Sequence, residues 1–269
     1  MKTGEPMTEQ TVLSYVNQRG VATVAINNPK KFNAFDDTII TELTAAFEEV
    51  RDNKEVRAMI LAATGKNFSA GGDLEWMKRV AGYSYKENLE DAKALAVMLK
   101  TLHFLPVPTI ARVQGVAFGG AVGLIACCDM AVATTQASFG LSEAKMGLTP
   151  ATISPYVISA IGQRAARRYF MTAERFSAET AAKLGLVSEV VEEERLDEEI
   201  ARLAEFLLGN SPVAIDAAKK LISVVAGQEI NDALINFTCE QMANIRVSKE
   251  GKEGVAAFLE KRKPSWSSS

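Results

Sequence analysis

The apolar residues near the start of the chain are spaced first as in strands and then as in a helix. Two segments rich in Val, Ala and Ile flank an Arg-Gly pair, which is typical of a β-hairpin. After Asp36, a residue type that caps helices well, apolar residues recur every three or four positions and predict a helix with one buried face. The expected order is strand, strand, helix and strand, over residues 11–18, 21–26, 37–53 and 57–63.

The middle of the chain continues this alternation. A short helix from Asp73 precedes helices over 86–103 and 121–128, and strands are expected over 109–113 and 129–133. Strands that alternate with helices usually pair in parallel, with the helices crossing between them. After residue 154 the pattern is mainly helical, with one short strand at 186–191; the helices are expected over 154–161, 165–171, 178–184, 196–208, 212–226, 231–245 and 249–261.

Two glycine turns follow predicted strands and precede helical segments, at 68–74 and 114–123. Backbone N–H groups at the start of a helix have no partner within the helix, and the helix dipole makes that end partly positive. Glycine lets a ligand approach the backbone closely, so these turns favour binding a negatively charged oxygen. The Gly-x-Gly-x-x-Gly spacing and the Walker lysine of nucleotide-binding loops are absent. Taken alone, each turn could equally serve only close helix packing.

One carboxylate lies in an apolar, turn-rich segment downstream, at Glu143 within residues 138–150. Apolar surroundings raise the pKa of a carboxyl group and suit it to proton transfer near neutral pH. The alternative for this residue alone is a solvated acid on a loop. Two backbone turns together with one acid are what an enzyme needs to stabilise an enolate.

These three segments, with residues 28–35 and 250–264, resemble the enoyl-CoA hydratase/isomerase (crotonase) superfamily over nearly the whole chain. The resemblance implies an α/β fold: a crotonase-like spiral of β-β-α units over residues 1–195 and a C-terminal helical trimerisation region over 196–269. Residues 147–157 are similar to bacterial methylglutaconyl-CoA hydratases.

The resemblance also implies roles for individual residues. Glu143 becomes the catalytic acid/base, and the N–H groups of Ala70 and Gly120 become the oxyanion donors. The substrate's coenzyme A would contact Lys30 and the backbone from 70 to 73, and residues of the last helix would reach it, often from a neighbouring subunit. The residues expected to bind substrate are Lys30, Ala70, Gly71, Gly72, Asp73, Gly120, Gly123, Phe258 and Lys261. A solvated basic C-terminus is the alternative for Lys261.

Gly123 departs from the pattern of the family. Its hydratases usually carry a second glutamate twenty residues before the first, and here that position is glycine. A single acid leaves two reactions open, hydration and double-bond isomerisation. We expect the missing side chain to open space beside the substrate's β-carbon and to remove a negative charge. Both changes favour a short, branched substrate with its own carboxylate, such as 3-methylglutaconyl-CoA, for which Lys78 and Arg79 are candidate partners.

Composition excludes several other classes of function. A net charge of -3 and a pI of about 5.5 argue against a nucleic-acid partner, and therefore against RNA binding. His103 is the only histidine and no CxxC spacing occurs, so neither a zinc site nor a Ser-His-Asp mechanism is expected. The reaction would need no cofactor apart from the coenzyme A of the substrate. A scaffold without catalysis is a further alternative, which Glu143 and the two intact turns oppose.

The remaining features concern location and assembly. Cys127 and Cys128 lie in an apolar run and predict reduced core residues of a cytoplasmic protein. Residues 1–10 are polar, so no signal peptide is expected, and no apolar run is long enough to span a membrane. The apolar surface of the last helices and the resemblance together favour a homotrimer or a hexamer.

Overall fold

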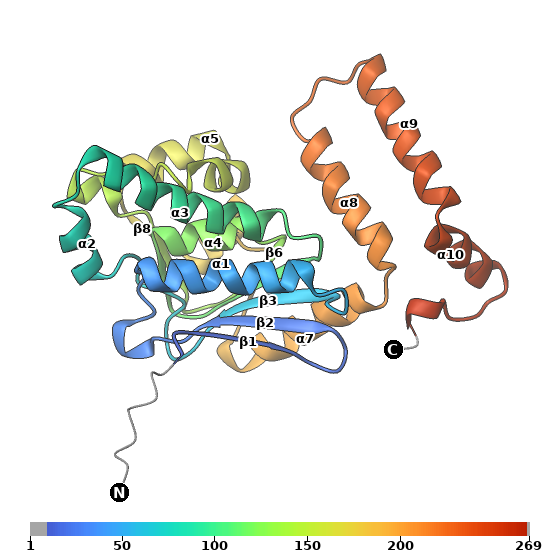
Figure 1. The fold of residues 1–269 in the computed structure, drawn as a ribbon, viewed down its shortest axis with the longest axis horizontal. Helices are drawn as coiled ribbons and strands as arrows, with labels where there is room; N and C mark the ends of the chain where they lie inside the picture. Colours follow the sequence, from blue (N-terminus) through green and yellow to red (C-terminus); the bar gives the residue numbers. More distant parts are fainter. Residues whose placement is uncertain (1–9, 268–269) are drawn as a thin grey trace, which may run out of the picture.

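The computed structural model describes residues 10–267. Residues 1–9 lie outside the described residues, and they make up almost all of the N-terminal segment in which no signal peptide is expected. A six-stranded sheet forms the centre of the fold (Figure 1). Its first two strands pair antiparallel and every later neighbour pairs in parallel, which confirms the predicted hairpin and crossovers. The strands lie in the order β1 (Val12–Val16), β2 (Val21–Ile26), β3 (Ala58–Ala63), β4 (Thr109–Val113), β6 (Met130–Thr134) and β9 (Glu189–Val191).

Helices cover both faces of this sheet because its strands are apolar on both sides. In β4, Ala111 faces the main core, whereas its neighbour Ile110 packs with Leu196 and Ile200 on the opposite face. The main core contains residues of α1 (Asp37–Asp52), α3 (Tyr85–His103), α4 (Gly120–Cys127) and α5 (Ser154–Thr172), and the opposite face is covered by α7 (Leu196–Leu208).

A second, three-stranded sheet lies beside the main one and was not predicted. Its strands are β5 (Val116–Phe118), β7 (Ser138–Gly140) and β8 (Arg175–Ser177). Three residues are too few to show a period of two, and the glycines in this region suggested only a turn. A break at Gly162, with φ of 74° and ψ of 157°, divides α5 near the boundary between the two helices predicted there.

The C-terminal helices extend away from the sheets (Figure 1). Neither α8 (Pro212–Val225) nor α9 (Asp232–Val247) contains a buried residue, and α10 (Lys249–Leu259) buries only Ala257. Lys219 Nζ holds α8 to the core through Asp129 Oδ2 at 2.7 Å. Within residues 10–267, no helix is both long and apolar enough to cross a bilayer. Two short helices complete the fold, α2 (Leu74–Val80) and α6 (Ala178–Leu184).

Candidate functional site

The first glycine turn is held in place by backbone hydrogen bonds from both sides. Ser69 N–H donates to Val116 O at 3.0 Å, and Phe118 N–H donates back to Ser69 O at 3.0 Å. On the other side, Phe35 N–H donates to Gly71 O and Asp73 N–H donates to Phe35 O, both at 2.7 Å. The turn therefore lies fixed between β5 and the segment that precedes α1.

These bonds correct one predicted oxyanion donor. Ala70 N–H already donates to Phe32 O at 3.0 Å, so the expectation that Ala70 offers a free donor is contradicted. Gly71 N–H donates to Ser69 Oγ at 3.2 Å. By contrast, no acceptor among residues 10–267 lies within hydrogen-bond reach of the Gly72 N–H, and Gly72 is exposed. The available donor of this turn therefore belongs to Gly72.

The second turn places another unpaired N–H at the start of α4. Gly119 precedes the helix with a φ of 55°, a conformation that favours glycine, and its N–H donates to Gly140 O at 2.9 Å. Gly120 is the first helical residue, and its N–H has no acceptor within the described part of the chain. This agrees with the sequence-based assignment of Gly120 as a donor, which stays a prediction until a ligand is bound.

Phe35 connects the two turns. Its backbone pairs with Gly72, and its ring lies 3.3 Å from the position that a Cβ atom on Gly120 would occupy. A Cβ atom on Gly71 would lie 3.3 Å from Phe118 O. The two turns are therefore in contact, and the two unpaired N–H groups belong to one site.

The Glu143 carboxyl lies against the second turn. It begins a short 3-10 helix, Glu143–Met146, that follows β7, and its Oε1 is 3.2 Å from the Cβ position of Gly119. Its Oε2 is buried without a hydrogen-bond partner among the described residues. Burial raises the pKa of this carboxyl group, and its own backbone N–H opposes the rise. An acid with a raised pKa beside a helix N-terminus is well suited to moving a proton.

Gly123 does not open the space that the sequence analysis expected. A Cβ atom on Gly123 would lie 2.3 Å from Cγ2 of Ile153, 2.8 Å from its Cβ and 3.6 Å from Cδ2 of Leu99. All three residues are buried. The volume that a second glutamate would need is therefore filled by Ile153, and the steric part of the branched-substrate argument is wrong.

Asp73 has a structural role in the described chain. Its Oδ1 accepts from Glu75 N–H at 2.9 Å and Trp76 N–H at 3.1 Å, capping α2, and its Oδ2 accepts from Lys31 Nζ at 2.8 Å. The Lys31 ammonium, together with these backbone N–H groups, holds the pKa of Asp73 below its usual range. Lys30, predicted to reach coenzyme A, is the exposed neighbour of Lys31 on the short helix Pro29–Lys31.

The other predicted contacts lie apart from this site. Phe258 is 82% exposed on α10, and Lys261 follows that helix, at the opposite end of the molecule from α2 (Figure 1). One chain therefore does not bring them to Glu143. Lys78 pairs with Glu75 at 2.6 Å, and Arg79 pairs with Asp37 at 2.5 Å, so both candidate partners of a distal carboxylate already hold acids.

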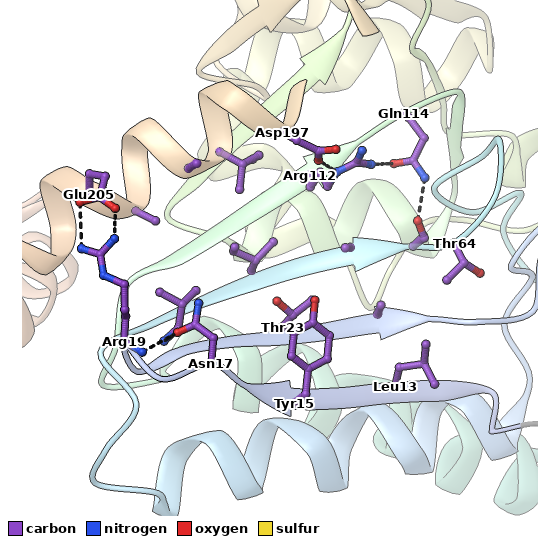
Figure 2. A pocket seen from close by; sticks show the side chains of 18 of the residues that line it. Leu13, Tyr15, Asn17, Arg19, Thr23, Thr64, Arg112, Gln114, Asp197 and Glu205 are labelled. Carbon is purple, nitrogen blue, oxygen red and sulfur yellow. Dashed lines mark hydrogen bonds and ion pairs between the residues drawn. The ribbon is translucent and has the colours of Figure 1, made fainter. Parts of the chain in front are cut away.

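A separate pocket of about 650 Å³ lies between α7 and the first strands of the main sheet (Figure 2). Two ion pairs to α7 border it: Arg19 with Glu205, and Arg112 with Asp197 at 2.6 Å between Nε and Oδ1. Glu143, Gly72 and Gly120 do not line this pocket. Residues 10–267 also contain no group of three or more His, Cys, Asp or Glu side chains arranged to hold a metal ion.

The sequence profile of the enoyl-CoA hydratase/isomerase family matches residues 16–269. The chain belongs to the enoyl-CoA hydratase/isomerase family. An enoyl-CoA hydratase from Shewanella pealeana is 45% identical with a TM-score of 0.93, over 96% of both chains. An enoyl-CoA hydratase from Mycobacterium smegmatis is 34% identical with a TM-score of 0.90, over 96% of this chain and 99% of its own. The short-chain-enoyl-CoA hydratase of Clostridium acetobutylicum is 31% identical, over 90% of this chain and 92% of its own.

Membership of the enoyl-CoA hydratase/isomerase family is consistent with an acyl-CoA substrate, and the structural matches show the crotonase fold. Sequence reasoning placed Gly72 among the substrate-binding residues but assigned the backbone donor to Ala70, and it gave no role to Phe35 and Ile153. Gly72 stands in the recognised motif, but only the pairing of its neighbours shows that its N–H is the unpaired one. Phe35 and Ile153 look like ordinary core residues, and no local signal marks them.

Proposed function

We propose that the chain adds water to, or removes it from, the α,β double bond of a short enoyl-CoA thioester. The observation that carries this proposal is the buried Glu143 carboxyl, with its unpartnered Oε2, beside the unpaired N–H groups of Gly72 and Gly120. Among residues 10–267, the other buried side-chain oxygen without a hydrogen-bond partner is Asp216 Oδ1, which lies on α8 and not at the glycine turns. The reaction needs no cofactor, because the coenzyme A belongs to the substrate.

In the proposed reaction, the thioester oxygen accepts hydrogen bonds from Gly72 and Gly120. Charge builds on that oxygen as the enolate forms, and each such donor is worth about 3–4 kcal/mol in the transition state. Glu143, as the carboxylate, takes a proton from water while the hydroxyl oxygen bonds to the β-carbon. It then returns the proton to the α-carbon, so that one water molecule is consumed and Glu143 ends as it began.

We propose 3-methylglutaconyl-CoA as the first substrate to test. The support is the similarity of residues 147–157 to bacterial methylglutaconyl-CoA hydratases, and the glycine at 123, which leaves no second carboxylate to repel an anionic substrate. The volume beside Gly123 adds no support for a branched substrate, since Ile153 fills it.

Isomerisation of the double bond is the second candidate. It requires one group that removes a proton from one carbon and returns it to another, and a site with a single acid satisfies this without a bound water. The filled position at Gly123 is the observation that favours it.

We propose that the chain assembles into a homotrimer, or a hexamer of two trimers, in the cytoplasm. The C-terminal helices expose large apolar side chains that would be costly to leave in water. A neighbouring subunit would also bring Phe258 and Lys261 to the coenzyme A, which one chain does not do. The most exposed are Ile222, Ile230, Val247, Phe258 and Leu259, all above 60%.

A substrate screen tests the reaction. Wild-type protein is assayed with crotonyl-CoA, 3-methylglutaconyl-CoA and a 3-enoyl-CoA, following hydration and isomerisation separately, and Glu143→Gln serves as the control for contaminating enzymes. Hydration that is fastest with 3-methylglutaconyl-CoA supports the proposal. Activity on the 3-enoyl-CoA alone supports the isomerase, and no turnover of any thioester refutes both.

A further inference from the structure

Gly123 and Ile153 form a contact with no room for another atom. Both are buried, and a Cβ atom on Gly123 would lie 2.3 Å from Cγ2 of Ile153, far inside van der Waals contact. Ile153 precedes α5 with a φ of -85°, so its own backbone is unstrained. The two residues therefore constrain each other: the isoleucine requires glycine on α4.

The segment from Glu143 to Ile153 contacts α4 and the residue before it at both of its ends. At one end of the segment, Glu143 Oε1 lies against Gly119, directly before the helix; at the other end, Ile153 lies against Gly123. Gly119 and Gly123 are four residues apart, about 6 Å along a helix axis. Between the contacts the segment has backbone hydrogen bonds of its own: Leu148 N–H donates to Glu143 O at 3.0 Å, Ala151 N–H to Thr149 O at 2.8 Å, and Ser154 N–H to Ala151 O at 3.2 Å.

We propose that Ile153 is a positioning residue that sets the place of Glu143 relative to the Gly120 N–H and keeps the site to one acid. The proposal rests on the function proposed above for Glu143. A change at the Ile153 end shifts the whole braced segment along α4, and with it the carboxyl group. Ile153 occupies the volume that a side chain at position 123 would need. It therefore excludes a second carboxylate at that position, together with any water that the carboxylate would bind.

The pH dependence of turnover should therefore report on Ile153. Burial raises the pKa of Glu143, and no ionisable side chain contributes to this rise. Neither α4 nor β7 carries a charged residue, and Lys145 on the same short helix is exposed. On the first half of α5, Tyr156 lies against the His103 ring at 5.1 Å, and the charged residues begin at Arg164. Loosening the Ile153 contact should admit water and lower this pKa.

The first experiment is a double-mutant cycle on thermal unfolding and on kcat. Gly123→Ala should lower Tm by about 4 °C or more and kcat by about 10- to 100-fold with little change in KM, since small displacements of a catalytic group are costly. In the Ile153→Gly background the same substitution should raise Tm, because the added methyl fills the vacated space. The expected result is therefore that Gly123→Ala lowers Tm in the wild-type background and raises it in the Ile153→Gly background.

Two matched variants control the cycle. Ile153→Val keeps the Cβ and Cγ2 atoms that meet Gly123, so it should keep wild-type kcat, with Tm lowered only by the loss of one buried methyl group. Gly82→Ala adds a methyl where the nearest atom lies at 3.5 Å, and should change neither Tm nor kcat. The acid limb of the kcat/KM profile should move to lower pH in Ile153→Gly and stay in place in Ile153→Val.

Several outcomes would overturn the proposal. Gly123→Ala with wild-type Tm and kcat would show that the contact does not constrain the segment. An unmoved acid limb in Ile153→Gly would show that Ile153 does not act on Glu143. If wild type turns over no enoyl-CoA, the proposed function fails, whereas the sign of Gly123→Ala in thermal unfolding still decides whether Gly123 and Ile153 are a matched pair.

Discussion

Replacing Glu143 by glutamine should slow the enzyme and at the same time stabilise it. Glutamine keeps the shape of the side chain and cannot carry the proton. A general acid–base group contributes about 10²- to 10⁴-fold, so kcat should fall by that factor, equivalent to about 3–5 kcal/mol in the transition state. Binding of the coenzyme A portion should change little, because no predicted contact to it involves this side chain.

The stabilisation follows from the buried oxygen without a partner. Burial raises the pKa of Glu143, so the folded chain prefers the neutral acid, and the ionised form costs stability above that pKa. A buried polar group without a hydrogen bond costs about 1–3 kcal/mol. The side chain is only partly buried and the amide also lacks partners, so we expect a net gain of about 1 kcal/mol, or about 2–4 °C in Tm, near pH 7.

The sign of this effect should depend on pH. Below the ordinary glutamate pKa of about 4.3 the carboxyl is neutral in both folded and unfolded chains, and the cost vanishes. As pH rises through the raised folded pKa the cost appears, so the advantage of Glu143→Gln should be absent near pH 4 and should grow as pH rises toward 8. Thermal unfolding followed by circular dichroism across this range measures it.

Glu198→Gln is the matched control, because that carboxylate is 72% exposed and lies 3.5 Å from Arg195. It should change Tm by little at any pH, since exposed pairs contribute about 0–1 kcal/mol. The reasoning is refuted if Glu143→Gln keeps more than a tenth of wild-type kcat. It is also refuted if the variant is less stable than wild type at pH 8.

Three further predictions concern the backbone donor, the α2 cap and the assembly. Gly120→Pro removes the N–H and should lower kcat by about 10²- to 10³-fold. The control Gly120→Ala adds the same Cβ contact to Phe35 but keeps the N–H, so equal losses of kcat in the two variants would assign the effect to packing. Asp73→Ala should cost about 1 kcal/mol at neutral pH. Because the pKa of Asp73 is lowered, its contribution should decrease as pH falls toward that low value, and urea unfolding at pH 7 and pH 3 measures the decrease. Ile222→Lys, on the exposed face of α8, should give a smaller particle mass by light scattering, with the circular dichroism spectrum unchanged. A particle mass equal to that of wild type would argue against assembly through this face.

The long elements could be predicted from sequence because each has enough residues to show its period. Helix α1 buries Ile39, Leu43 and Phe47 at helical spacing, and the parallel strands are short apolar runs between helices. The strands β5, β7 and β8 have three residues each, so no pattern is visible, and their existence depends on pairing with each other. Such strands form because tertiary contacts fix them, not because of local preference.

The same distinction holds for the candidate site, where some residues are marked by local motifs and others depend on distant contacts. Motifs mark Glu143 and Gly120 as candidates from the sequence alone, and their catalytic roles stay predictions. The choice between Ala70 and Gly72 depends on which N–H finds an acceptor, and Phe32, thirty-eight residues before Ala70, decides it. The space at Gly123 depends on Ile153, thirty residues later. Neither relationship is visible in a local stretch of sequence.

The lack of buried residues in α8 and α9 has a consequence for how the protein reaches its native state. Helices α8 and α9, of 14 and 16 residues, are close to the length of about 12–15 residues below which isolated helices are marginal in water even in favourable sequences. The sheets and their helices possess a core of their own and should refold in a unimolecular phase independent of protein concentration. If the last helices gain their partners only from other chains, their ordering should follow as a second phase that accelerates with concentration. Dilution would then expose these helices to proteolysis while leaving the core intact.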